Sequence, residues 1–231
     1  MSQIYEVEDP QDPYEPFKGW IDIEVRDGEG RVVQKGRHRM HSFNNNFLAA
    51  LLTMLSSVGN KYMTSGTVTG DSGSAATILG EYWYYSGITG AGGTPMALNA
   101  PAGTDSFGIL VGSGIGAFNL TQYSLASKIP HGTAAGQLSY GTSSITDLGV
   151  NASLSPPVYQ IQIVRPFSNL TASAITINEV GLEAKNFWRD SGPAIKANVT
   201  YLIARDVLST SYSVPPNGSA TVAITIGVTV G

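Results

Sequence analysis

Histidine and cysteine are common metal ligands in proteins, and this chain has few of either. Its 231 residues include three histidines and no cysteine, which excludes disulfide and thiolate chemistry. His38 and His41 lie close together in the basic segment 35–41. A structural zinc ion takes four protein ligands, and a catalytic one takes three plus water. Because no carboxylate cluster accompanies the two histidines, the sequence predicts no metal site.

Paired carboxylates are what a glycoside hydrolase needs. Glu179 and Glu183 would share one face of a strand, but about 13 Å apart at ~3.3 Å per residue. The carboxylates of glycosidases lie about 5–9.5 Å apart. The acids Asp71, Glu81 and Asp105 of the central region leave a polysaccharide hydrolase as a minor hypothesis. No serine lies in a G-x-S-x-G motif, and we predict that the protein is not an enzyme.

A glycine-rich motif, Gly112-Ser-Gly-Ile-Gly116, follows an apolar run, as phosphate-binding loops do. Its spacing is G-x-G-x-G instead of G-x-G-x-x-G, and no amphipathic helix follows it. The sequence therefore predicts a tight turn at this motif and no cofactor.

Two charged residues, Arg205 and Asp206, interrupt the apolar strand expected at 201–208. A charge in such a strand is usually paired when it is buried. We predict that Arg205 meets Glu179 across the sheet as a structural ion pair without a catalytic role.

Alternating apolar and polar residues predict strands in much of the chain. Between Val222 and Val230 every second residue is Val or Ile, and the residues between them are Ala, Thr or Gly. This period of two places an apolar set on one face of a strand and a hydroxyl-rich set on the other. Further strands are expected at 20–26, 31–35, 107–111, 123–129, 136–140, 158–165, 174–183 and 201–208. Pro166 should end the pairing of its strand, and 186–193 should form a loop.

The pattern predicts a mainly β protein, either an antiparallel β-sandwich or a jelly-roll-like fold. One amphipathic helix is expected at about residues 42–57. Ser42 would be its N-cap, and its apolar stripe would consist of Phe43, Phe47, Leu48, Leu51, Leu52 and Leu55.

The chain divides into an extended acidic N-terminal arm, residues 1–17, and a single β-rich domain, residues 18–231. The domain carries a long insertion rich in Gly, Ser and Thr at about 60–106. By composition the arm is either a disordered tail or a segment that becomes ordered along a neighbouring subunit. In the second case its anchors at the assembly interface would be Tyr5, Val7, Tyr14 and Phe17.

Charge is sparse, at 13% of residues with a net charge of −4. This excludes binding to nucleic acid through phosphate neutralisation, which needs a basic face. No apolar run approaches the ~20 residues of a membrane helix, and the N-terminus lacks the features of a signal peptide. We expect a soluble protein, synthesised in a host cytoplasm, without membrane insertion.

Aromatic residues cluster at Tyr82, Trp83 and Tyr84, and Trp188 adds a further indole. Sugar sites use aromatic platforms with a few polar groups. The alternative function is therefore a carbohydrate- or receptor-binding module on a viral or cell surface, with a host-surface glycan as its partner. The same aromatics also suit a core or a subunit interface.

Several short stretches, taken in order, resemble uncharacterised virion structural proteins of tailed phages and archaeal viruses. The stretches are 28–33, 42–47, 109–114, 123–127, 136–140, 165–169, 177–182 and 202–208. The resemblance implies a β-rich subunit of a virus particle, and it carries over no catalytic residues. We therefore expect a non-enzymatic virion protein (a capsid, decoration, turret or tail component) that self-assembles through low-charge β surfaces. Its partners would be copies of itself and other virion proteins.

Overall fold

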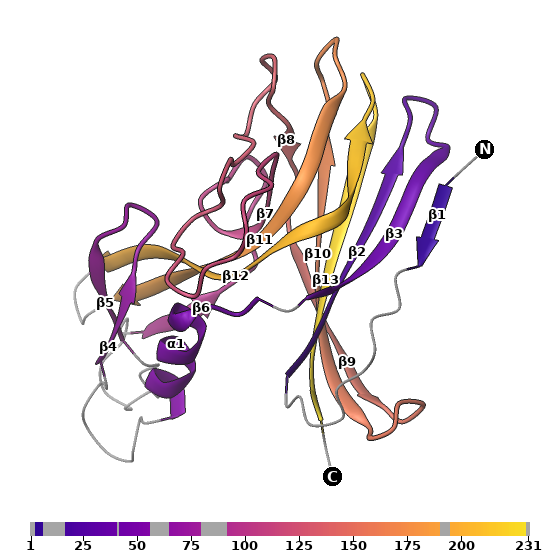
Figure 1. Ribbon diagram of the computed structural model, residues 1–231. Coiled ribbons are helices and arrows are strands. Elements are labelled where there is room, and N and C mark those ends of the chain that lie inside the picture. The colour runs from indigo at the N-terminus through magenta and orange to yellow at the C-terminus, as the bar shows by residue number, and fades with distance from the viewer. Residues whose placement is uncertain are drawn as a thin grey trace.

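The computed structural model describes residues 3–6, 17–40, 42–55, 65–79, 92–189 and 195–229. It contains one helix and thirteen strands within this part of the chain (Figure 1). The strands are β1 (Gln3–Glu6), β2 (Phe17–Arg26), β3 (Val32–Met40), β4 (Ser65–Thr69), β5 (Ala75–Leu79), β6 (Gly92–Ala97), β7 (Gly108–Gly112), β8 (Ser139–Tyr140), β9 (Ser144–Asn151), β10 (Val158–Ser168), β11 (Ile175–Arg189), β12 (Ile195–Val214) and β13 (Ser219–Thr229). The helix is α1 (Asn45–Leu55).

The larger sheet has seven strands in the order β1-β3-β2-β13-β10-β8, with β9 also paired to β10. β1 runs parallel to β3, and the other pairings in this sheet are antiparallel. The centre of the sheet joins distant parts of the chain, because β13 pairs with β2 so that Val222 lies opposite Ile23.

The smaller sheet has four strands in the order β12-β11-β6, with β7 also paired to β11. β4 and β5 form a separate antiparallel hairpin. β6 and this hairpin come from the segment expected to be a loop-rich insertion, so part of that segment completes the smaller sheet.

The two sheets pack against each other around one apolar core. Buried residues of the larger sheet, such as Ile21, Ile163 and Val222, belong to the same cluster as Val180 and Leu182 of the smaller one. The prediction of a mainly β antiparallel sandwich is thus confirmed, whereas a jelly roll is not.

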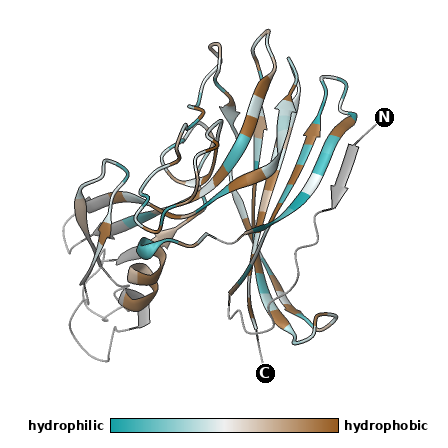
Figure 2. Cartoon of the chain, viewed as in Figure 1, coloured by the Kyte–Doolittle hydropathy of each residue, from teal (hydrophilic) through white to brown (hydrophobic). Residues whose placement is uncertain are grey.

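The larger sheet changes its buried face along its length. In β13 the buried residues are Ala220, Val222 and Ile224 in the first half, but Thr225 and Gly227 in the second. Val228 is 43% exposed, although it continues the apolar alternation. The expected apolar and hydroxyl-rich faces exist, but the apolar one is buried over only part of the strand. In Figure 2 the alternation is visible along the strands of the larger sheet, where brown bands of hydrophobic residues alternate with paler bands.

The helix begins at Asn45, three residues later than expected. Asn44 is its N-cap, because its Oδ1 accepts hydrogen bonds from the backbone N–H groups of Asn46 and Phe47 at 3.1 and 3.2 Å. The expected cap, Ser42, instead donates its hydroxyl to Asp206. Phe47 packs into the core, but Leu48 and Leu52 are 58% and 66% exposed, so they do not belong to the buried stripe.

Replacing Asn44 by alanine is expected to lower the free energy of unfolding by about 2 kcal/mol. The change removes the cap, and it also removes two amide donors to the carbonyls of Gln122 and Leu202. Asn44→Ser is the control, because its hydroxyl keeps an uncharged acceptor for the helix while the two amide donors are lost. Urea denaturation of both variants measures the difference. An alanine variant as stable as the parent would contradict the capping role.

Three other expectations were wrong. Pro166 lies inside β10 opposite Thr221, so it does not end the pairing of that strand. β11 continues through Arg189, which places residues 186–189 in a strand and not in a loop. The segment 123–129 lies in a long connection between β7 and β8 instead of forming a strand.

In the described part of the chain, no helix is long and apolar enough to cross a membrane.

Candidate functional site

The clearest polar centre of the molecule is the pair formed by Glu179 and Arg205 in the smaller sheet. Arg205 lies opposite Gly181 in the register of β11 and β12, and Nε of its side chain donates to Oε2 of Glu179 at 2.5 Å. Both side chains are fully buried. The structure therefore contains the ion pair expected from the sequence.

Both members of the ion pair also hold the connection that follows β7. Oε1 of Glu179 accepts the backbone N–H groups of Gly114 and Ser127, at 3.1 and 2.7 Å. Arg205 donates to the carbonyl of Gly116 at 2.9 Å and to Oε1 of Gln122 at 3.0 Å. The hydrogen-bonding capacity of the carboxylate is thus largely used within the fold, which suits a structural group and not a catalytic one.

The glycine motif lies directly against the buried carboxylate of Glu179. A Cβ on Gly112 or Gly114 would come within 2.4 or 2.5 Å of Oε1 of Glu179. Neither glycine has a positive φ, whereas Gly108 at the start of β7 does. The predicted tight turn is therefore not the reason for the motif. The glycines allow the backbone to approach the carboxylate closely.

A second buried charge, Arg165 of β10, has no equivalent in the sequence predictions. Its guanidinium lies 4.8 Å from the ring centre of Tyr140, and burial lowers the pKa of Arg165 to about 10. Its hydrogen bonds go to backbone carbonyls, namely those of Pro101, Thr104, Phe107, Ile109 and Gly141. Arg165 thereby fixes the loops at one end of the sandwich.

Glu183 is a buried acid whose pKa departs strongly from that of a free carboxyl group. Its side chain is buried, at 3% exposure, and burial raises its pKa to about 8. Lys128 opposes this effect, whereas the charges of Asp71 and Asp105 add to it. Perturbed acids of this kind occur at active sites, but they also occur in structural cores.

Of the two histidines in the basic segment, the structure describes only His38. His38 lies between the sheets, where its Nε2 is 2.7 Å from the hydroxyl of Tyr212 and its Nδ1 is 3.1 Å from that of Ser209. Burial lowers its pKa. His41 lies outside the described residues. Within those residues, no group of three or more His, Asp or Glu side chains could hold a metal ion.

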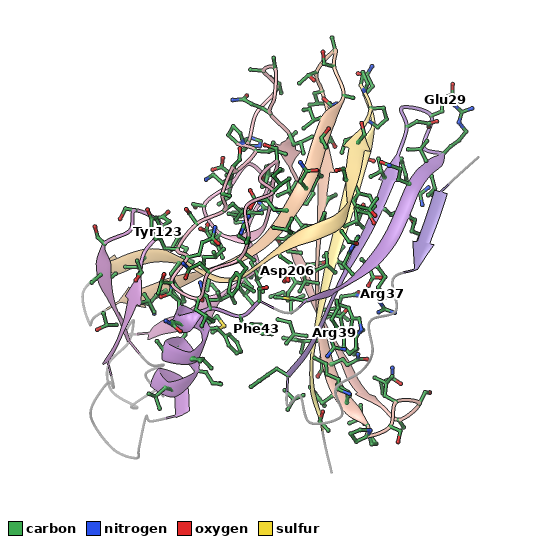
Figure 3. All side chains as sticks on the ribbon, viewed as in Figure 1. Glu29, Arg37, Arg39, Phe43, Tyr123 and Asp206 are labelled. Carbon is green, nitrogen blue, oxygen red and sulfur yellow. The ribbon has the colours of Figure 1, made fainter. Side chains whose placement is uncertain are left out.

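The residues proposed for an assembly interface are only partly described. Tyr5 lies in β1, opposite Gly36 of β3, while Val7 and Tyr14 fall outside the described residues. Phe17 begins β2 and contacts Phe43 and Phe47, with ring centres 6.3 and 5.5 Å apart. Phe17 is therefore engaged within its own chain. Phe43 is labelled beside α1 in Figure 3.

The aromatic residues of the alternative ligand site are not assembled by the described structure. Tyr82, Trp83 and Tyr84 lie outside it, and for Trp188 only the backbone position in β11 is described. An aromatic residue that the sequence predictions missed is Trp20, on the outer face of β2. The guanidinium groups of Arg37 and Arg39, labelled on β3 in Figure 3, lie 5.8 and 5.4 Å from its ring.

Comparison with protein-family models, with curated proteins and with solved structures found no match.

Proposed function

We propose that this chain is a non-enzymatic structural subunit of a virus particle that assembles with copies of itself through low-charge β surfaces. The observation that carries the proposal is the number of large apolar side chains left exposed on a protein with few charges. They include Leu48, Leu52, Ile115, Leu120, Ile145, Leu148, Val150, Leu170 and Val228. Exposed apolar side chains that lie together are typical of interaction sites, and three of these residues, Ile145, Leu148 and Val150, belong to one short strand, β9.

The burial of three charged residues inside the fold supports the same proposal. Arg165, Glu179 and Arg205 are fully buried and bonded within the fold, so they fix loops instead of meeting a ligand. Surfaces poor in charge lose little hydration energy when they dock, and the cores of protein interfaces are depleted of charged residues. The viral part of the proposal depends on the resemblance of the short segments described above.

Light scattering coupled to gel filtration, together with negative-stain electron microscopy of the purified chain, tests the proposal. We expect oligomers whose size grows with protein concentration and which form rings, tubes or shells. A monomer at the highest soluble concentration would refute self-assembly. Mass spectrometry of purified virus particles tests the viral origin, and the chain should be present there in many copies.

Deleting residues 1–16 is expected to weaken assembly and to leave the melting temperature nearly unchanged. β1 pairs with the outer edge of β3. Without β1 this edge is unpaired, and wrong strand pairing between copies would compete with correct assembly. The deletion stops before Phe17, because that ring packs against α1. Replacing Glu8 and Asp9 by Gln and Asn is the control that keeps the length of the arm. Equal particle yields from the deletion and the parent chain would exclude a role for the arm.

A further inference from the structure

One end of the larger sheet carries an apolar row that the described residues leave uncovered. The register places Val150 of β9 opposite Tyr159 of β10, and Tyr159 opposite Val228 of β13. Residues directly opposite each other in antiparallel strands lie on the same face of the sheet. These three side chains, at 54%, 40% and 43% exposure, form what we call the end face.

The end face continues the surface that forms the core of the sandwich. Two rows further along the same strands, Ile163 and Ile224 lie opposite each other and are buried beneath the smaller sheet. The row between them, Ile161 and Ile226, is half-buried. Exposure therefore rises along a single face whose residue types hardly change. Its sequence pattern is that of a strand covered along its whole length.

The opposite face of the same end shows the reverse arrangement. Lys18 and Thr225 are buried there, at 2% and 3% exposure, while Val228 on the apolar side is exposed. Within one chain the sheet thus buries polar residues and exposes apolar ones at this end. Such an inversion is costly in water, and it is relieved when a second surface covers the apolar side.

The charges around the end face favour a second copy of this chain as that surface. Residues 144–164 and 219–229 contain no lysine or arginine. Their one acid is Asp147, whose Oδ2 accepts a hydrogen bond from the hydroxyl of Tyr159 at 2.5 Å. Two identical faces can therefore meet almost without repulsion between like charges, whereas a charged peptide would find no complementary partner.

The shape and size of the end face agree with this choice. The apolar face of one sheet packs well against that of another at a spacing of about 10 Å. Together with Ile145 of β9, which lies opposite Ile163 on the same face, the exposed side chains offer on the order of 300 Å² of apolar area, more than a third of what one partner buries in a standard interface.

We propose that the end face packs against the end face of a second copy across a two-fold axis, so that each copy completes the sandwich of the other. This inference rests on the proposed self-assembly and specifies the surface that carries it.

Opposite charges introduced at the end face provide the test. The first variant carries Val150→Lys and Val228→Lys, and the second carries Val150→Asp and Val228→Asp. Each variant alone should dimerise about a hundredfold more weakly than the parent, because like charges would be buried against each other. An equimolar mixture of the two should recover a heterodimer. Sedimentation velocity measures the association, and circular dichroism checks that each variant is folded.

The matched control carries Ile115→Lys and Leu170→Lys, two exposed apolar sites outside the strands of the end face. It should dimerise as the parent does. If the charged end-face variants also associate like the parent, the proposed interface is wrong while self-assembly stands. If the parent itself stays monomeric at every concentration, both proposals fail.

A cysteine variant gives a second measurement that does not depend on tolerance of buried charge. The chain has no cysteine, so Tyr159→Cys, at the centre of the end face, introduces the only thiol. Under mild oxidation this variant should form a disulfide-linked dimer on a non-reducing gel, at a rate at least tenfold above that of Leu170→Cys. Equal rates for the two variants would overturn the inference.

Discussion

Replacing Arg205 by methionine is expected to lower the free energy of unfolding by about 3–5 kcal/mol. The change leaves Glu179 charged, fully buried and without its cation. It also removes the donors to Gly116 and Gln122, so the connection after β7 loses part of its attachment. Chemical denaturation monitored by circular dichroism measures the loss, and a change below about 1 kcal/mol would contradict a structural role for the pair.

The double variant Glu179→Gln with Arg205→Met separates the ion pair from the loop contacts. It removes the uncompensated charge while keeping one acceptor for the N–H groups of Gly114 and Ser127. We expect it to be more stable than Arg205→Met alone. The surface pair of the half-buried Glu24 and the exposed Arg26 provides the matched control, because Arg26→Met should cost less than about 1 kcal/mol.

The stability of the protein is expected to fall as the pH rises through the range in which Glu183 ionises. Burial raises the folded-state pKa of this group from its ordinary value of 4.5 to about 8. The folded state therefore binds more protons than the unfolded state between these values. Its contribution to stability is complete below pH 4.5 and is lost as the pH rises through 8. The expected loss is about 1.4 kcal/mol for each pH unit inside this window.

The variant Glu183→Gln isolates this effect from the other titrating groups. Its side chain has a similar shape and does not ionise, so its free energy of unfolding should vary less between pH 6.5 and 9. His38 acts in the opposite direction. Burial lowers the pKa of His38, so this residue reduces stability only as the pH falls below 6.5, the ordinary pKa of histidine. Denaturation curves of parent and variant at matched pH values give the difference. Parallel pH profiles would exclude Glu183 as the cause.

The features that could be predicted from the sequence follow from local patterns. The hairpin of β2 and β3, the strands β11 to β13 and the turn at residues 215–218 all have alternating apolar residues or turn residues in a short window. Asn217, for example, has a φ of 57°, as expected for Asn before Gly in a turn. The pair of Glu179 and Arg205 was also predictable, because two charges in neighbouring apolar strands have few other partners.

The rest depends on contacts between distant segments. Arg165 bonds to carbonyls of loops that precede it by 24–64 residues, and no local pattern marks those acceptors. The change of buried face in β13 depends on where the smaller sheet stops covering it. The alternating residues of β13 carry no information about that point. Asn44 and Ser42 are both good N-cap residues, and the choice between them depends on Asp206, which takes the hydroxyl of Ser42.

The pairing of β2 with β13 has a consequence for how the protein is made. The central strand of the larger sheet, β13, is translated about 180 residues after the hairpin of β2 and β3 that needs it as a neighbour. Until β13 is made, the nascent hairpin leaves the edge of β2 unpaired. Nascent chains on neighbouring ribosomes of one message expose the same edge at high local concentration. We therefore expect expression yield to depend more on chaperones and on the speed of translation than the stability of the finished fold would suggest.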